Sequence, residues 1–242
     1  MKIRMDKMLS NSGIGSRKQI KTDARKGCIE VNGTIEKDSS RIIDTDTDAV
    51  KYKGETIKYI QFIYLMMNKP RGVVSATEDN YDKTVIDLLR NEEKFYKPFP
   101  VGRLDKDSEG LLLITNDGKL AHELLSPKKH VDKTYYVEAA EEVTEDDVKA
   151  FGNGVILKED NYKTLPAKLQ IIESGYPSIC LVTIREGKFH QVKRMFNAVN
   201  NEVSYLKRIS LGPLKLDESL KTGQYRHLTE EELGTLPYPQ KL

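Results

Sequence analysis

The chain of 242 residues has few cysteines and histidines, which limits the metal and redox chemistry it can perform. Its two cysteines, Cys28 and Cys180, stand alone without a CxxC pair. Neither a disulfide framework nor a zinc site is therefore indicated. The four histidines are His122, His130, His190 and His227. None has a carboxylate at the spacing of a metal-ligand set. We expect two reduced thiols and no bound metal.

The chain also lacks a long apolar segment. No run approaches the ~20 apolar residues that a helix needs to span a bilayer. The N-terminal MKIRMDKMLSN alternates charged and apolar residues at helical spacing and has no signal-peptide core. With 38% hydrophobic and 31% charged residues, the composition is that of a globular protein long enough for one large or two smaller domains. We expect a cytoplasmic monomer without membrane contact.

The net charge of +2 is unevenly distributed along the chain. Residues 1–30 contain eight basic and three acidic residues, and residues 181–215 contain seven and two. Residues 138–161 are acidic instead, with two basic and eight acidic residues. Two basic regions indicate a polyanion contacted at two places. Clusters of this kind also occur as merely solvated faces.

The first 60 residues have the pattern of a small α/β module. Met5, Met8 and Leu9 fall at i, i+3 and i+4, which predicts a short helix with one apolar face. Further along, CIEVNGTI (28–35) places Asn-Gly between two short strands, a strong hairpin signal. The polar stretch KGETIK (53–58) is expected to link this module to the rest of the chain.

A second helix is predicted for SRKQIKTDARKG (16–27), which starts with a serine N-cap and stops at a glycine. Ile20 and Ala24 form its apolar stripe. Its basic residues lie beside that stripe and are Arg17, Lys18, Lys21 and Arg25. Such a row suits a phosphate backbone, but it equally suits a solubilising surface, and the residues alone leave both interpretations open.

RMDKMLSNSGIGSRKQI (4–20) and KGCIEVNG (26–33) resemble the S4 domain, a small RNA-binding module of ribosomal proteins and RNA-modifying enzymes. The resemblance covers about a quarter of the chain. It implies that residues 1–60 form an RNA-binding domain. The side chains expected to contact RNA are Arg4, Lys7, Arg17, Lys18, Lys21 and Arg25.

Residues 61–242 are expected to form a second domain in which strands and helices alternate without repeats. Strands are predicted at 62–67, 110–115, 134–139, 167–173, 179–184 and 203–211. Helices are predicted at 82–90, 118–125, 144–151 and 189–199. This pattern fits an α+β domain with a mixed, mainly antiparallel sheet flanked by helices.

GRLDKDSEGLLLITNDG (102–118) joins a charged loop to a wholly apolar strand. Gly102 permits an unusual backbone turn, and Asp105 is expected at the mouth of a cleft ahead of the strand at 110–115. An aspartate in a loop is most often a turn or cap residue. The residues alone therefore favour that interpretation.

The same stretch closely resembles the catalytic-loop signature of pseudouridine synthases. Three further stretches match that family in order, namely NKPRGVVSA (68–76), KTYYV (133–137) and EGKFHQVKRMF (186–196). The resemblance implies that Asp105 is the catalytic residue and that Tyr135 stacks on a flipped uracil. It also implies an isomerisation of uridine that needs no cofactor, because no atom is gained or lost.

The family also has a cation that pairs with the catalytic acid, at the position after H-Q-hydrophobic. Here that position is Lys193, where many relatives have arginine. Lys193 and Arg194 point about 100° apart on a helix, so one faces the cleft and the other faces RNA. Arg194 stays the second candidate for the pair. Arg103, beside the catalytic aspartate, is a further candidate for RNA contact.

These observations predict an S4-domain pseudouridine synthase that acts on ribosomal RNA or a ribosomal assembly intermediate. HQVKRMF most resembles the small-subunit (16S) enzymes, with a large-subunit enzyme as the alternative. A catalytically silent protein that binds structured RNA or the ribosome has no reason to keep GRLD, K-x-Y and HQVKR together. A metal-dependent nuclease predicts clustered acids at ligand spacing, which the sequence lacks.

Overall fold

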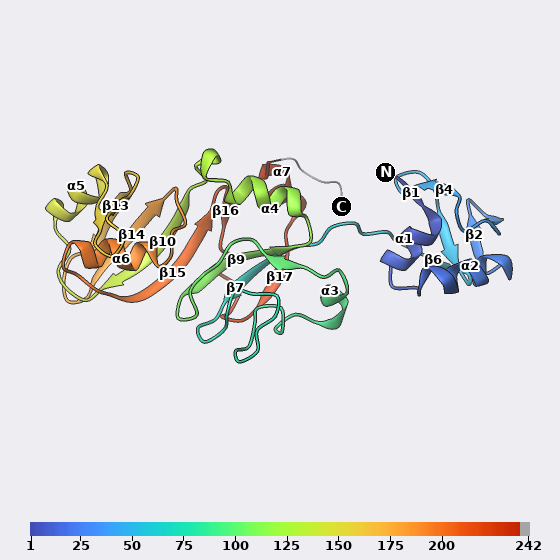
Figure 1. Ribbon diagram of the computed structural model, residues 1–242, viewed down its shortest axis with the longest axis horizontal. Coiled ribbons are helices and arrows are strands. Elements are labelled where there is room, and N and C mark those ends of the chain that lie inside the picture. Colours follow the sequence, from blue (N-terminus) through green and yellow to red (C-terminus); the bar gives the residue numbers. More distant parts are fainter. Residues whose placement is uncertain (238–242) are drawn as a thin grey trace. The chain divides into compact units, whose positions relative to one another are not determined.

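The computed structural model describes residues 1–237, which divide into two compact units (Figure 1). The first is Met1–Phe62, and the second begins at Ile63. The end of the expected second domain, residues 238–242, lies outside the described residues. None of the helices in residues 1–237 is long and apolar enough to cross a membrane.

The first unit packs two helices and two small antiparallel sheets around one core. Its helices are α1 (Met5–Asn11) and α2 (Arg17–Arg25). β1 (Lys2–Arg4) pairs with β4 (Ile42–Asp44). The other sheet has the order β3-β2-β5-β6, formed by Thr34–Ile35, Ile29–Val31, Val50–Tyr52 and Glu55–Thr56. The expected apolar faces of both helices are buried in this core; they comprise Met5, Met8, Leu9, Ile20 and Ala24.

Local signals place the ends of α2 and the first hairpin as expected. The Ser16 side chain accepts a hydrogen bond from the Gln19 backbone N–H and so caps the helix. The chain turns at Gly27 with φ 77°. Between β2 and β3, Asn32 and Gly33 have φ values of 52° and 80°, the left-handed conformation that a tight two-residue hairpin requires.

The expected linker at 53–58 is wrong. That stretch forms the β5–β6 hairpin of the first unit, with Lys53 and Gly54 at its turn (φ 50° and 86°). Lys-Gly can adopt this turn because glycine tolerates positive φ without steric cost. Ile57, immediately after the hairpin, still packs against the core of the unit. The connection to the second unit therefore begins later than the polar composition indicated.

The second unit is built on one nine-stranded sheet. Seven strands follow the order β13-β14-β10-β15-β9-β7-β17, and outside this order β8 pairs with β9 and β16 pairs with β15. β9 and β15 pair in parallel, and the other pairs are antiparallel. The strands are β7 (Tyr64–Lys69), β8 (Phe99–Pro100), β9 (Glu109–Thr115), β10 (Lys133–Ala139), β13 (Lys168–Glu173), β14 (Ser178–Ile184), β15 (Val203–Leu211), β16 (Leu214–Lys215) and β17 (Tyr225–His227). The predicted α+β fold with a mixed, mainly antiparallel sheet is confirmed.

Helices and a separate small hairpin complete this unit. The helices are α3 (Asn91–Phe95), α4 (Gly118–Leu125), the 3-10 turn η1 (Pro127–Lys129), α5 (Glu145–Asn153), α6 (Gln191–Ala198) and α7 (Glu230–Thr235). β11 (Ile156–Leu157) and β12 (Tyr162–Lys163) form the hairpin. In Figure 1, α5 and α6 lie with β13, β14 and β10 at one end of the unit, and α3 and α4 lie with β9 and β7 at the other.

The helix predicted at 82–90 is also wrong. This stretch is a series of turns, held by backbone hydrogen bonds from Val85 N–H to Val74 and from Val74 N–H to Lys83, and by the Asp87 carboxylate, which accepts from the Thr84 N–H and hydroxyl. Such local side-chain bonds compete with the helical pattern. The helix starts only after this stretch, at Asn91. The other predicted elements agree with the structure to within a few residues.

The two ends of the sheet meet where β9 pairs with β15 through only two residue pairs, Glu109 with Lys207 and Gly110 with Arg208. Gly110 has φ 103°, and a Cβ there would lie 2.2 Å from the Arg208 carbonyl oxygen. No side chain fits this position, because both the space and the backbone conformation require glycine. The junction therefore depends on this close approach of two backbones.

Replacing Gly110 with alanine should destabilise the second unit by about 3 kcal/mol or more, because overpacking and a strained φ act together. Gly118→Ala is the matched control, since a Cβ at Gly118 meets nothing within 4 Å. Urea denaturation measures both. Equal free energies of unfolding for the two variants would contradict the proposed role of the close approach.

Candidate active site

A pocket lies between the loop that precedes β9 and the start of α6. We call residues 101–108 the Asp105 loop. The pocket is lined by Arg103, Leu104, Asp105 and Ser108 from this loop, by Tyr135, Ile184 and Leu206 from three strands, and by Gly187, Lys188, His190, Gln191 and Val192 near α6. Because the loop leads into β9 and the other lining residues come from β10, β14, β15 and α6, the pocket lies at the junction of the two ends of the sheet.

Lys69, at the end of β7, holds the Asp105 loop from beneath. Its side chain is completely buried. Its ammonium group donates to four carbonyl oxygens, at 2.9 Å to Pro70, 3.1 Å to Asp105, 3.5 Å to Lys106 and 2.9 Å to Ser108. One buried cation thus gathers the backbone on both sides of Asp105.

Burial lowers the pKa of Lys69 to about 8, and the nearby carboxylates of Asp105, Asp107 and Glu109 partly oppose this shift. A buried ammonium group is tolerated only when its protons are hydrogen-bonded. The carbonyl oxygens of the loop supply those acceptors. At neutral pH Lys69 therefore stays charged and keeps the loop in place.

Two further contacts define the path of the loop. Gly102 has φ 76°, and a Cβ there would lie 2.8 Å from Leu125 on α4. The Ser75 hydroxyl donates to the Leu104 carbonyl at 2.9 Å and accepts from the Leu104 N–H at 3.0 Å. The loop is thus fastened before Asp105 as well as beneath it.

The Asp105 carboxylate lies between two groups of α6 and the turn before it. Lys193 Nζ is 3.4 Å from Asp105 Oδ2, and His190 Nε2 is 3.6 Å from Asp105 Oδ1. Lys193 approaches Asp107 Oδ1 more closely, at 2.6 Å. Burial is the largest single effect on the pKa of Asp107 and raises it, but the hydrogen bond and the charge of Lys193, with smaller contributions from the backbone and His190, together outweigh burial and lower the net pKa. Lys193 therefore serves two carboxylates of the Asp105 loop.

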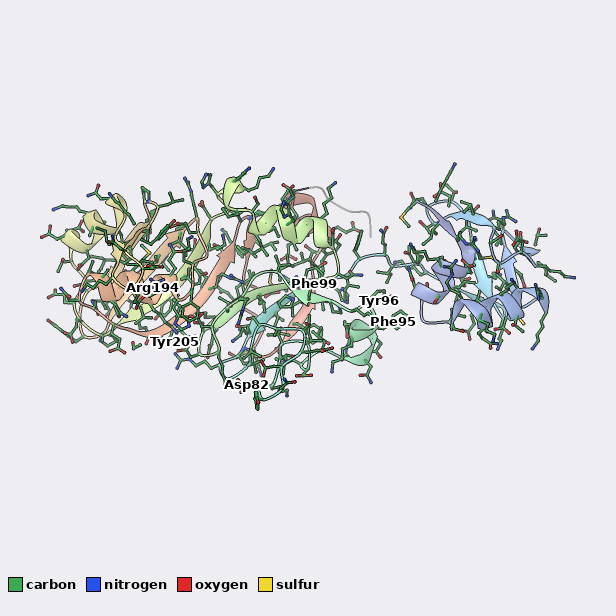
Figure 2. The ribbon with its side chains drawn as sticks, in the orientation of Figure 1. Asp82, Phe95, Tyr96, Phe99, Arg194 and Tyr205 are labelled. Carbon is green, nitrogen blue, oxygen red and sulfur yellow. The ribbon has the colours of Figure 1, made fainter. Side chains whose placement is uncertain are left out.

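Tyr135 and Tyr136 point to opposite faces of β10, as strand geometry requires. Tyr135 is buried and lines the pocket. Tyr136 packs edge-to-face on Tyr205, with ring centroids 5.9 Å apart, and donates to Glu138. Figure 2 shows Tyr205 on β15. Only Tyr135 is therefore available to a ligand in the pocket.

Arg194, the alternative partner for Asp105, is engaged elsewhere. Its guanidinium group contacts Glu159 and is 2.6 Å from Asp160, both in the segment between β11 and β12. It also donates to the Phe189 carbonyl at 3.3 Å. Figure 2 shows it on α6. Of the two consecutive cations, Lys193 is the one whose charge lies beside Asp105.

The basic residues expected to bind RNA on the first unit are of two kinds. Arg4 and Arg17 both pair with the buried Asp6, at 2.8 and 2.9 Å. Hydrogen bonds, from Arg4 first and then from Arg17, lower the pKa of Asp6 to about 2 against the opposing effect of burial. Arg4 and Arg17 remain exposed, as are the others, for which the structure of residues 1–237 gives no ion pair: Lys7, Lys18, Lys21 and Arg25. In the second unit Arg103 is exposed at the pocket.

Sequence reasoning missed two of these residues. Lys69 is the only charged residue of the buried strand β7, YLMMNK. A lysine at the end of such a strand signals a buried cation that needs acceptors. The other is His190, and no sequence signal indicated that its ring would lie beside Asp105. Both cysteines are free, as expected. Among residues 1–237, no group of three or more His, Cys, Asp or Glu side chains could hold a metal ion.

Comparison with known families decides what this pocket belongs to. Residues 63–198, more than half of the chain, match the family model of RNA pseudouridylate synthase. The chain belongs to the RNA pseudouridylate synthase family. The synthase is therefore an RNA uridine isomerase, as the sequence predicted. Residues 3–48 match the S4 domain, which confirms the resemblance of the first unit.

Relatives of this synthase match along its full length. An uncharacterised RNA pseudouridine synthase of Bacillus subtilis, YtzG, is 54% identical over 98% of this chain and 100% of its own length. The ribosomal small subunit pseudouridine synthase A of Vibrio vulnificus is 38% identical, covering 97% and 99%. A crystal structure of a pseudouridylate synthase has 36% identity and a TM-score of 0.68, covering 97% of this chain and 100% of that chain.

The depressed pKa of Lys69 predicts a pH-dependent stability. Between about pH 8 and the ordinary lysine pKa of 10.5, unfolding takes up a proton at this residue. The free energy of unfolding then gains up to about 1.4 kcal/mol per pH unit from Lys69, and nothing at lower pH, where both states are protonated. The free energy of unfolding of Lys69→Met, measured by urea denaturation, should lack this gain.

Lys83→Met, which removes an exposed lysine of the same unit, is the control. The stability difference between wild type and Lys69→Met should widen from pH 8 to pH 10, whereas that between wild type and Lys83→Met should not. Parallel curves for wild type and Lys69→Met would contradict the buried position of the ammonium group.

Proposed function

We propose that this synthase converts one specific uridine of small-subunit (16S) ribosomal RNA to pseudouridine, with Asp105 as the catalytic group. The observation that carries the proposal is the position of the Asp105 carboxylate, in the wall of a pocket that also contains Tyr135 and with Lys193 3.4 Å away. The choice of ribosomal RNA is supported by the full-length relatives named small-subunit synthases. The substrate is the free RNA or an assembly intermediate.

The reaction is an exchange of bonds within one nucleotide. The N1–C1′ bond breaks, uracil turns within the pocket, and a C5–C1′ bond forms. C5 loses its proton and N1 gains one, so atoms and charge balance without a redox partner or donor. Asp105 assists the release of uracil either by attack on the nucleotide or by taking a ribose proton.

Tyr135 and the apolar wall keep the detached base in place. The Tyr135 ring offers a face on which uracil stacks, and its hydroxyl reaches the base edge. Ile184, Val192 and Leu206 complete a wall that limits the escape of the free base. Because neither Asp105 nor Tyr135 can reach its target inside a stacked helix, the uridine must be flipped out of the RNA.

Lys193 and His190 support Asp105. A cation near a carboxylate favours its ionised form and restricts its orientation. Lys193 does this while also pairing with Asp107. Its two partners fix the ammonium between two positions of one loop. It acts on Asp105 through this contact rather than on the substrate.

RNA binding is divided between the two domains. Residues 1–60 dock the RNA through Lys7, Lys18, Lys21 and Arg25, with Arg4 and Arg17 oriented by Asp6. Residues 61–242 perform the chemistry, with Arg103 at the pocket. Arg194, the other RNA contact expected in this domain, pairs with Glu159 and Asp160 instead. The synthase acts as a monomer, in the cytoplasm where ribosomes are assembled.

Cells that lack this synthase should lose one pseudouridine from small-subunit RNA. A wild-type copy should restore it, and an Asp105→Asn copy should not, because the amide keeps the shape of the side chain but neither ionises nor accepts a proton. The purified Asp105→Asn protein should bind the RNA normally and turn over at least about 10³-fold more slowly. Pseudouridine mapping and a gel-shift assay measure these effects.

Asp82→Asn provides the matched control. Asp82 is an acid next to the Asp105 loop, where it pairs with Lys106 at 2.7 Å, and its removal changes the net charge equally. This variant should retain activity close to that of the wild type. Substantial turnover by Asp105→Asn would refute the catalytic assignment, and loss of a large-subunit pseudouridine instead would refute the substrate.

The double variant Lys21→Ala, Arg25→Ala should bind RNA more weakly, because each residue supplies an exposed positive charge on α2. The plot of log binding constant against log salt should lose about one unit of slope per phosphate contact removed. The single-turnover rate at saturating RNA should not change. Lys37→Ala, Lys51→Ala, on exposed positions of the same domain, is the control; equal salt slopes for both double variants would contradict docking through α2.

A further inference from the structure

The turn that precedes α6 displays an aromatic ring to solvent beside the pocket. The Phe189 side chain is 75% exposed. Its ring stacks on the His190 ring, with centroids 3.8 Å apart and planes 18° apart. One face of Phe189 is thus covered by imidazole, while most of the remaining ring surface is open.

This turn is held rigidly, although the phenylalanine contributes little to the core. Arg194 donates to the Phe189 carbonyl and is itself fixed by Asp160. Gln191 accepts from the Lys188 N–H at 3.0 Å and donates to Glu186 at 2.9 Å. On a flexible loop, an exposed phenylalanine would be unexceptional. Here several hydrogen bonds keep an apolar ring in water.

The backbone conformation of His190 also indicates a functional role for this turn. His190 has φ 48°, a left-handed conformation that is uncommon for residues other than glycine, although histidine, like asparagine and aspartate, adopts it more often than most. Residues kept in such conformations cluster at functional sites, where the surrounding contacts maintain them. The conformation places the imidazole between Phe189 and Asp105.

Phe189 is linked to Asp105 through the His190 ring. His190 Nε2 is 3.6 Å from the Asp105 carboxylate, and the same ring is stacked on Phe189. One imidazole ring therefore separates Phe189 from the acid. The base next to a uridine held at Asp105 is therefore within reach of the Phe189 ring.

We propose that Phe189 is a stacking platform for the nucleobase adjacent to the target uridine. The inference rests on the proposed function, which places that uridine at Asp105. His190 backs the platform, and Arg194 positions it through the backbone. Since every base presents a π-face, Phe189 anchors the strand on either side of the flipped nucleotide without selecting a sequence.

The role differs from those of Asp105 and Tyr135, because the stacked neighbour does not change during the reaction. Contacts that are equal in the bound complex and in the transition state lower KM and leave kcat unchanged. Phe189→Ala should therefore raise KM for the RNA about tenfold, the typical loss for one stacked base. Phe189→Trp should keep KM close to the wild-type value. Phe189→Leu, which is apolar but has no π-face, should raise KM as Phe189→Ala does.

Tyr176→Ala is the matched control. Tyr176 is 73% exposed on the same unit, in the turn at the opposite end of β14. Because both rings are mostly exposed, thermal unfolding should show wild-type stability for both variants. KM for an unmodified 16S transcript should change only with Phe189→Ala. Equal KM values for Phe189→Ala and Tyr176→Ala would overturn the proposal.

Photocrosslinking separates this inference from the proposed function. A 16S transcript that carries 5-iodouridine at a small fraction of its uridines should crosslink to Phe189, because iodouracil couples to aromatic rings stacked on it. The assay reads binding and needs no turnover. Absence of pseudouridine formation by the wild type refutes the proposed function, whereas crosslinks located only away from Phe189 refute the stacking role.

Discussion

The ammonium group of Lys69 is enclosed beneath the Asp105 loop, where four backbone carbonyls accept its protons. A buried charge is costly unless it is fully hydrogen-bonded, so the cation and the loop require each other. Any other path of the loop would leave a charge without acceptors in the interior. The position of the Asp105 carboxylate follows from this constraint, because its own carbonyl is one of the four acceptors.

The rest of the site is brought to Asp105 by the junction of the sheet. At Gly110 the backbone of β9 approaches that of β15 too closely for any side chain. This contact sets β15, which carries Leu206, beside β9, the strand that follows the Asp105 loop, and β10, which carries Tyr135, lies next to β15. α6 then adds Lys193 and His190 from the other end of the sheet. The pocket thus combines a loop from one end with a wall and a cation from the other.

Much of the fold could be predicted from local patterns. Alternating burial along β10 and β14, the serine cap of α2 and the Asn-Gly turn are properties of a few consecutive residues. The errors arose where local signals conflict with tertiary context. The 82–90 stretch has a helical apolar pattern, but its backbone pairs with that of Val74, and bonds between Thr84 and Asp87 stabilise turns. The polar composition of residues 53–58 predicts a linker, although these residues form the turn and the second strand of a hairpin.

The site could be predicted only as a set of residues. The ordered motifs name Asp105, Tyr135 and a cation from α6, since each lies in a recognisable stretch. They could not decide between Lys193 and Arg194, because that choice depends on the acids near β11 and β12 that engage Arg194. The buried contacts of Lys69 and the stacking of Phe189 on His190 likewise arise from segments far apart in the sequence or from an unusual backbone conformation.

The most direct test of the central claim is a crystal structure of the Asp105→Asn variant bound to unmodified substrate RNA. The account predicts one uridine flipped into the pocket, with its C1′ or its base within about 3.5 Å of the side chain at position 105 and its ring against Tyr135. A target uridine held elsewhere, with the side chain at position 105 facing only protein, would contradict it.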